Sequence, residues 1–247
     1  MAHLVLGYPT LEESLRTAEI YIAAGAEMLE LQIPFSHPTA DGPVITAACR
    51  IAVEQQRVTV TDCLDAIRRL RNKYPGQEMM VMSYLNRLYT YGFSKFQQQM
   101  AALGIRHLIV PDLPPDAPLP IHAGDSFKQN LGLVPVVAAN VSGTRLDELL
   151  AGGSDFFYLM SDFKITGSTF SLHPRLEQVV TRIRAANRAI RIGIGFGIET
   201  PEQVQAVVAV ADYAIIGSAL IRAAEEGRLE DYFGQFINTA RGATLVG

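Results

Sequence analysis

The chain has 247 residues, of which 49% are hydrophobic and 19% are charged. This composition is typical of a globular protein and excludes a disordered chain, and a chain of this length buries enough surface to fold without a disulfide or a metal. The net charge of −4 offers no basic surface for nucleic acid or for an anionic membrane.

The cysteines and the first residues of the chain indicate a cytoplasmic protein. Cys49 and Cys63 lack the spacing of a metal site, and we interpret them as reduced thiols in helices. Residues 1–10 have neither the basic segment nor the long apolar run of a signal peptide. The most apolar window, residues 204–221, contains a glutamine and an aspartate, and we expect a helix and then a buried strand there rather than a membrane span.

Short apolar runs alternate along the chain with amphipathic stretches. We expect eight strands, at residues 2–6, 28–33, 78–83, 107–110, 132–137, 156–160, 190–194 and 213–216. Helices are expected between them at residues 11–23, 44–55, 60–73, 93–103, 144–151, 174–186 and 201–209, and two of these follow N-cap threonines, Thr10 and Thr200. Strict alternation predicts a parallel sheet, and eight strand–helix units in 247 residues favour a closed (β/α)8 barrel over an open, doubly wound sheet. The predicted architecture is therefore a single TIM-barrel domain over residues 1–247.

Two of the expected connections are long. One covers residues 34–43 after the second strand, and the other covers residues 161–173 after the sixth. In a barrel both lie at the C-terminal face, where active sites are built. Loops of this length in a compact domain are usually functional.

The ends of the last two expected strands indicate a phosphate site. The seventh strand runs into Gly195-Phe196-Gly197 and the eighth into Gly217-Ser218. Glycine lets backbone N–H groups approach phosphate oxygens, and the start of a helix favours an anion. Either motif alone is also typical of a tight turn, but the two together favour phosphate binding.

The second expected strand carries a candidate acid–base residue. Alternation places Glu30 and Gln32 on the face that points into the barrel. A buried acid is costly unless it is paired or neutral. An internal ion pair is one interpretation of Glu30, but its place near the C-terminal end of a strand favours general acid–base chemistry. Asp41 ends the following loop, and the sequence Asp-Gly-Pro taken alone indicates a turn or a helix cap.

Residues 29–43 (LELQIPFSHPTADGP) resemble the signature L-E-L-G-x-P-F-S-D-P-x-A-D-G-P of the tryptophan synthase alpha chain. Further motifs follow in the family's order, and they are Leu6-Gly7-Tyr8-Pro9, Tyr84-Leu85-Asn86, Pro111-Asp112-Leu113-Pro114, Tyr158-Leu159-Met160-Ser161, Thr166-Gly167, Gly195-Phe196-Gly197 and Gly217-Ser218. The resemblance covers nearly the whole chain, and the motifs together are highly specific.

The resemblance implies retro-aldol cleavage of indole-3-glycerol phosphate to indole and glyceraldehyde 3-phosphate in tryptophan biosynthesis. Glu30 matches the family's acid–base residue, which moves protons between the side-chain hydroxyl and indole C3, and Asp41 matches the carboxylate that holds the indole N–H. The family's substrate and phosphate contacts match Tyr158, Thr166, Gly167, Phe196, Gly197, Gly217 and Ser218. No metal or organic cofactor is implied for this chain. The implied partner is a beta chain that carries pyridoxal phosphate, in an alpha2beta2 heterotetramer.

The chain departs from the family pattern close to Glu30. Gln32 stands where the signature has glycine, and its bulk and two hydrogen-bonding groups predict either a blocked substrate or an unproductive Glu30 rotamer. His3 stands where the family tends to have an apolar residue. The sequence also starts without the helix that usually precedes the first strand and plugs the bottom of the barrel.

Further departures fall in the two long loops. His37 replaces an aspartate that pairs with a beta-chain lysine, and a mostly neutral histidine cannot supply that charge. We expect residues 34–41 and the loop around Asp112 to contact the beta chain. After the sixth strand, Asp162 replaces an arginine and brings like charge towards the phosphate, and Lys164 replaces a glycine in a loop that must close.

These observations leave three functional hypotheses. The intact Glu30 and Asp41 favour a working lyase subunit. The departures favour an alpha chain with impaired or lost cleavage that still binds the beta chain and activates it allosterically. A third hypothesis is another phosphate-binding barrel, such as a sugar-phosphate isomerase or epimerase. The two-carboxylate loop argues against the third, and the five histidines show no clustered metal spacing.

Overall fold

The computed structural model describes residues 1–114, 131–160, 163–166, 169–195 and 197–244, with only the backbone described at residues 163–166, 169–171 and 243–244. The chain divides into two compact units. Residues 2–133 form the N-terminal unit, and Met1 with residues 134–247 forms the C-terminal unit. Within the described ranges, no helix has both the length and the apolar character needed to cross a membrane.

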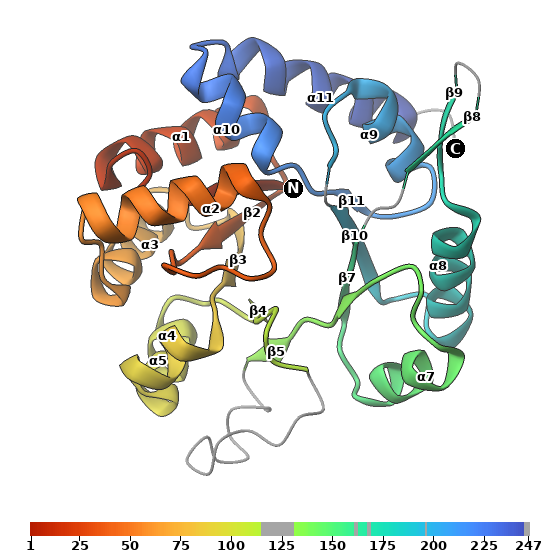
Figure 1. Cartoon of the computed structure of the whole chain (residues 1–247), viewed down its shortest axis with the longest axis horizontal. Coiled ribbons are helices and arrows are strands. Elements are labelled where there is room, and N and C mark those ends of the chain that lie inside the picture. Colours follow the sequence, from red (N-terminus) through yellow and green to blue (C-terminus); the bar gives the residue numbers. More distant parts are fainter. Residues whose placement is uncertain (115–130, 161–162, 167–168, 196, 245–247) are drawn as a thin grey trace. The chain divides into compact units, whose positions relative to one another are not determined.

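The N-terminal unit is built on a five-stranded parallel sheet with its strands in chain order. The strands are β1 (Ala2–Val5), β2 (Met28–Gln32), β3 (Glu78–Met82), β4 (His107–Ile109) and β5 (Gly132–Leu133). The helices of this unit are α1 (Leu11–Ala24), α2 (Pro43–Arg50), α3 (Val60–Lys73), α4 (Leu85–Tyr91) and α5 (Phe93–Ala102), and a π-helical turn, η1 (Ile51–Gln55), continues α2. Figure 1 shows these helices, coloured red to yellow, flanking the sheet.

Local sequence explains where these helices begin and which face they bury. The Thr10 side chain accepts a hydrogen bond from the backbone N–H of Glu13 and so caps α1, as predicted. Helix α3 begins with a full capping box between Thr59 and Asp62. Its buried residues are Val60, Cys63, Leu64, Ala66, Ile67 and Leu70, which recur at the three- and four-residue spacing of a single apolar stripe.

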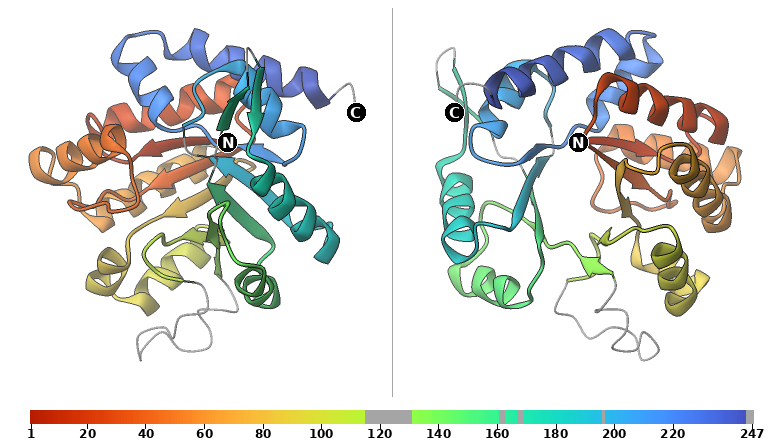
Figure 2. Two further views of the ribbon diagram at one scale, coloured as in Figure 1. Left: turned by 45° about the vertical axis from the view of Figure 1, so that its right-hand side comes forward. Right: turned by 180° about the vertical axis from the view of Figure 1, so that it is seen from behind.

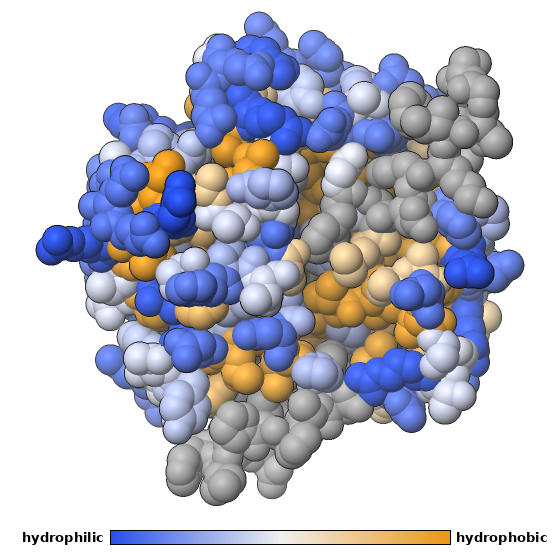
Figure 3. Space-filling model, viewed as in Figure 1, coloured by the Kyte–Doolittle hydropathy of each residue, from blue (hydrophilic) through white to orange (hydrophobic). Residues whose placement is uncertain are grey.

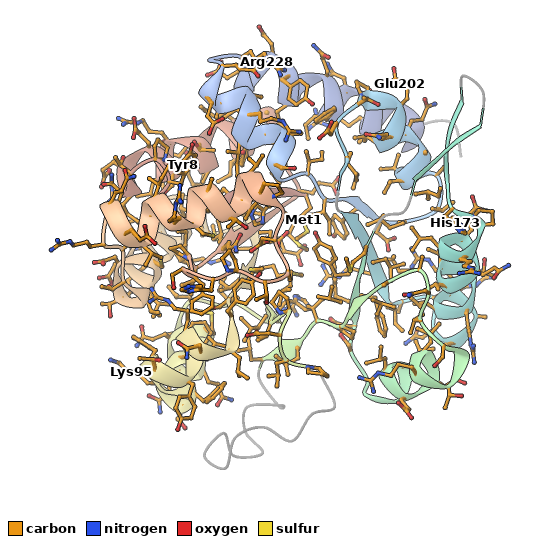
Figure 4. All side chains as sticks on the ribbon, viewed as in Figure 1. Met1, Tyr8, Lys95, His173, Glu202 and Arg228 are labelled. Carbon is orange, nitrogen blue, oxygen red and sulfur yellow. The ribbon has the colours of Figure 1, made fainter. Side chains whose placement is uncertain are left out.

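The C-terminal unit contains a four-stranded parallel sheet in the order β11-β10-β7-β6. Its strands are β6 (Val136–Val137), β7 (Phe156–Met160), β10 (Arg191–Gly195) and β11 (Tyr213–Ala214), and its helices are α7 (Gly143–Ala151), α8 (Pro174–Ala186), α9 (Pro201–Val208), α10 (Ser218–Glu225) and α11 (Leu229–Thr244). Thr200 caps α9 as predicted, and it forms a full capping box with Gln203. His173, labelled in Figure 4, caps α8 by accepting the backbone N–H of Arg175 on its ring nitrogen.

Each of the eight expected strands contains observed strand, but one expected strand and one expected loop need correction. The strand expected at residues 132–137 is divided into β5 and β6, because Pro135 between them has no N–H to donate to a ladder. Residues 161–173 were expected to form a loop, and this is wrong for most of the segment. There β8 (Phe163–Thr166) and β9 (Thr169–Leu172) pair in antiparallel fashion.

The sequence of this hairpin accounts for the missed strands. Phe, Ile and Thr residues at positions 163, 165, 166, 169 and 170 have high strand propensity and lie on both sides of a Gly-Ser pair. Strand β9 packs against α9, beside which the hairpin stands in Figure 2.

Candidate active site

Strands β1 and β2 place three polar side chains on one face of the N-terminal sheet. The register pairs His3 with Glu30 and Val5 with Gln32. Neighbours in register point to the same side of a sheet, and side chains two apart on one strand share that side. His3, Glu30 and Gln32 therefore form one polar group. They are 4%, 3% and 0% exposed, respectively.

His3 and Glu30 form a buried pair. His3 Nδ1 lies 3.3 Å from Glu30 Oε1. Burial disfavours the protonated ring, but the Glu30 carboxylate, with a further contribution from Asp41, more than offsets this and raises the pKa of His3. The side chain of Gln32 also favours the protonated ring, although no hydrogen bond of ordinary geometry joins the two. Among the described residues, His3 Nε2 and Glu30 Oε2 have no hydrogen-bond partner.

Asp41 is held by donors from two different strand ends. Its Oδ2 accepts hydrogen bonds from Gln32 Nε2 at 2.8 Å and from the Tyr84 hydroxyl at 2.9 Å. The same hydroxyl accepts the backbone N–H of Ala40 at 3.0 Å. Burial raises the pKa of Asp41, and His3, Gln32 and Tyr84 offset only part of that effect. Asp41 is therefore a positioned carboxylate in a poorly hydrated place.

The structure separates the two local interpretations of Asp41. Its backbone N–H bonds to Pro38 O at 3.1 Å, so it does close a turn. Its side chain is not the cap of α2, because the N-cap is Gly42 and no side chain caps that helix. The cap interpretation is therefore wrong, and the carboxylate is free to bind Gln32 and Tyr84.

The loop from Pro34 to Asp41, which we expect to contact the beta chain, carries the side chains of Phe35 and His37. Phe35 stacks on Tyr84 with ring centroids 5.4 Å apart and meets the His37 ring edge-on at 6.1 Å. His37 is exposed, and its Nδ1 lies 2.8 Å from Ser36 Oγ. Asp112 is also exposed, and its Oδ1 accepts the backbone N–H of Leu85 at the start of α4.

In the C-terminal unit, the predicted phosphate residues stand at strand ends. Gly195 is the last residue of β10, where a Cβ would lie 2.9 Å from Tyr158 Cζ and overlap the tyrosine hydroxyl, so only glycine fits there. Gly197 has φ +73°, a conformation that glycine adopts without strain. Gly217 precedes α10, whose first residue is Ser218. The first amides of a helix have no partner within the helix and suit an anion.

Several of the residues singled out from sequence lie outside the described part of the chain. The residues outside the described part are Asp162, Gly167 and Phe196. The side chains of Lys164 and Thr166 also lie outside it. Their predicted roles stay predictions.

A pocket of about 380 Å³ lies in the C-terminal unit between the loop that precedes α7 and the first turns of α8. Asn140, Val141, Arg175 and Arg182 are among its lining residues, and Arg182 also pairs with Asp147 at 2.6 Å. Figure 3 shows apolar surface in this region bordered by hydrophilic residues. None of the predicted site residues lines this pocket. Across the described ranges, no group of three or more His, Cys, Asp and Glu side chains has the arrangement of a metal site.

Sequence reasoning missed the roles of His3 and Tyr84 at this site. From the sequence, His3 is only a departure from the family and Tyr84 is only part of a motif. The signal for His3 is a polar residue in a strand that is otherwise apolar. Tyr84 follows β3 as Asp41 follows β2, and the ends of adjacent parallel strands meet at one edge of a sheet.

Comparison with known proteins decides the family. The model of the tryptophan synthase alpha chain family matches residues 1–239. The chain belongs to the tryptophan synthase alpha chain family. A tryptophan synthase alpha chain of Syntrophotalea carbinolica is 33% identical over 227 residues, which is 92% of this chain and 88% of the relative. One from Dehalococcoides mccartyi is 33% identical over 241 residues, or 98% and 93% of the two chains.

Solved structures agree with this assignment. A crystal structure of tryptophan synthase from M. tuberculosis is similar with a TM-score of 0.82 and 28% identity, covering 97% of this chain and 91% of that chain. The predicted α/β-barrel fold class is thereby confirmed. This alpha chain is a member of a lyase family of tryptophan biosynthesis, and family membership implies a beta chain as partner.

Proposed function

We propose that this alpha chain cleaves indole-3-glycerol phosphate to indole and glyceraldehyde 3-phosphate, with Glu30 at the centre of the acid–base chemistry and Asp41 holding the indole N–H. The observation that carries the proposal is the hydrogen bond that Asp41 Oδ2 accepts from the Tyr84 hydroxyl at 2.9 Å, which fixes the carboxylate in place. A carboxylate held by fixed donors can stabilise charge that develops on the indole nitrogen without reorganising. Two carboxylates in different surroundings suit a reaction that needs one to exchange protons and one to stay ionised.

The remaining parts of the proposal come from the family resemblance. The phosphate would bind backbone N–H groups of Gly197 and Ser218 or their neighbours, with Gly217 giving close approach. Tyr158, Thr166, Gly167 and Phe196 would complete the substrate contacts. No metal or organic cofactor takes part in this chain. We propose a cytoplasmic protein with a single barrel domain, joined to a beta chain that carries pyridoxal phosphate in an alpha2beta2 assembly.

One contact favours a second candidate function, an activating subunit with impaired cleavage. Gln32 is fully buried, and its amide donates to the oxygen of Asp41 that already accepts the Tyr84 hydroxyl. An oxygen that already accepts two hydrogen bonds is a weaker acceptor for a third. The Asp41 carboxylate would therefore accept a hydrogen bond from the indole N–H less strongly. In this case the chain would still bind and activate the beta chain.

The test is release of indole from indole-3-glycerol phosphate, measured with the cognate beta chain present. Cleavage predicts indole release that Glu30→Gln and Asp41→Asn reduce by about 10²–10⁴-fold. If the complex makes tryptophan from added indole faster than the free beta chain but releases no indole, the activating-subunit function holds instead. If neither activity appears, both proposals fail.

A further inference from the structure

We propose that His3 is a catalytic residue of this alpha chain, which exchanges a proton with the substrate through Nε2 while Glu30 positions the ring from its Nδ1 side. The proposal rests on the proposed cleavage function and changes which atom carries the proton. His3 belongs to no motif of the family resemblance described above. Its assignment comes from its place opposite Glu30 on β1.

The geometry is that of a carboxylate–histidine pair. Glu30 Oε1 lies 3.3 Å from His3 Nδ1, and both side chains are almost completely buried. A carboxylate on one ring nitrogen holds the proton there and leaves the other nitrogen to accept or donate. Histidine Nε2 is then the atom of the pair that can meet a substrate.

In the part of the chain that the structure describes, two atoms of the pair have no hydrogen-bond partner, and this argues against a purely structural ion pair. Among the described residues, His3 Nε2 and Glu30 Oε2 are both buried and lack a hydrogen-bond partner. Buried polar groups in folded proteins nearly always have a partner, because an unpaired one has lost its hydration without compensation. A pair retained only for stability would be expected to satisfy these atoms, whereas a pair that binds substrate leaves one of them open.

The surrounding charges set the protonation of the ring. Within the N-terminal unit, the titratable groups that act on His3 are Glu30 on β2 and Asp41 in the loop after it, and the Tyr84 hydroxyl contacts Asp41. Both carboxylates raise the pKa of His3 against the effect of burial. This direction favours the protonated ring, which is the form that can donate a proton to the substrate.

One atom, His3 Nε2, then carries out both proton transfers of the cleavage. Protonated Nε2 gives its proton to indole C3, forming a C–H bond and a cationic ring whose N–H faces Asp41. The neutral Nε2 takes the proton of the side-chain hydroxyl, and the electron pair of that O–H bond becomes the carbonyl bond of the aldehyde. The bond between indole C3 and the side chain breaks, and its electron pair neutralises the ring. His3 ends the cycle protonated, and no proton is consumed.

The experiment combines histidine NMR titration of the full chain with kinetics of its complex with the beta chain. We expect His3 to hold its proton on Nδ1 when the ring is neutral and to have a pKa above that of an ordinary histidine, and we expect Glu30→Gln to lower that pKa. We expect kcat/KM to fall as pH rises through the same pKa, because the acid form is lost. His3→Phe should lower kcat/KM by about 10²–10⁴-fold and remove this limb of the profile. His173→Asn, which keeps a side-chain cap on α8, should change neither kcat/KM nor its pH profile.

Each contrary result has a separate meaning. If the wild-type complex releases indole and His3→Phe is as fast or faster with the same pH profile, His3 is not catalytic although the proposed function stands. If Glu30→Gln leaves the titration midpoint of His3 unchanged, the pairing of His3 with Glu30 is wrong. If the wild-type complex releases no indole, the cleavage function and the catalytic role of His3 fail together, and the titration still decides the pairing. His3→Gln, checked by thermal unfolding, replaces His3→Phe if the latter does not fold.

Discussion

Replacing Gln32 with glycine has opposing effects on the stability of the N-terminal unit. The change removes a hydrogen bond to the Asp41 carboxylate, worth about 1.5–3 kcal/mol, and places glycine within β2 at a cost of about 0.5–1 kcal/mol. It also removes the carbonyl oxygen of Gln32, which is buried without a partner among the described residues, and this returns about 1–3 kcal/mol. We expect the free energy of unfolding to fall by roughly 1–2 kcal/mol, a loss that a domain of ordinary stability tolerates.

The same change should raise activity. Without Gln32, the Tyr84 hydroxyl is the one donor to Asp41 Oδ2 that remains among the described residues, and the space beside Glu30 opens. Misplacement of a substrate by about 1 Å can cost on the order of 10²-fold in rate, so we expect a gain of that size in kcat/KM for indole release. Gln32→Leu keeps most of the bulk but not the hydrogen bond, and it separates the two causes. Adding Asp162→Arg and Lys164→Gly should raise the rate further, and Glu30→Ala should abolish the gain.

Two results would refute this reasoning. A parent protein that already releases indole at ordinary enzyme rates, about 1–10 per second, has no impairment for Gln32 to explain. A Gln32→Gly variant that folds, binds the beta chain and shows no gain would mean that the contact between Gln32 and Asp41 does not limit cleavage. A gain with glycine but not with leucine would assign the effect to bulk.

Three further predictions follow from single contacts. Tyr84→Phe should raise the pKa of Asp41 and lower the free energy of unfolding by about 1–2 kcal/mol. In urea unfolding this loss should grow as pH rises and Asp41 ionises, and a loss that does not depend on pH would contradict the prediction. His37→Asp should strengthen activation of the beta chain, and unchanged activation would mean that this residue does not alter the coupling. Gly195→Ala should lower the free energy of unfolding by roughly 1–3 kcal/mol, because the added Cβ meets the Tyr158 ring. Gly234→Ala is the control, because there is open space around its added methyl group. Equal stability of the two variants would refute the steric argument.

The sequence predicted the regular elements well because their periodicity is local. The capping threonines and the apolar stripe of α3 are properties of neighbouring residues, so the ranges of α3 and α8 could be predicted without tertiary information. The hairpin of β8 and β9 is not predicted because the barrel pattern favours a loop after the sixth strand, although the residues of this segment have high strand propensity. The π-helical turn η1 depends on a shift of one residue in hydrogen bonding, which no pattern of apolar residues records.

The site could be predicted only in part, for a similar reason. Alternation along β2 is enough to place Glu30 and Gln32 on one face. The pairing of His3 with Glu30 requires the register between two strands, and a shift of one residue would have sent His3 to the opposite face. The contact between Tyr84 and Asp41 joins two loops that follow different strands, and its geometry depends on the backbone path of both.

His3 and Gln32 have to be considered together, because each brings a hydrogen-bond donor to a different carboxylate of the site. His3 lies against Glu30, Gln32 donates to Asp41, and the charge of Asp41 also acts on His3. Removing Gln32 alone leaves a more basic Asp41 near the His3 ring, and removing His3 alone leaves Glu30 without its partner and Asp41 without a group that lowers its pKa. Residues that share one network do not contribute independently, so the effects of the two single replacements should not sum to the effect of the double replacement. The two departures from the family pattern are therefore better explained as one rearrangement around the carboxylate pair than as two separate losses.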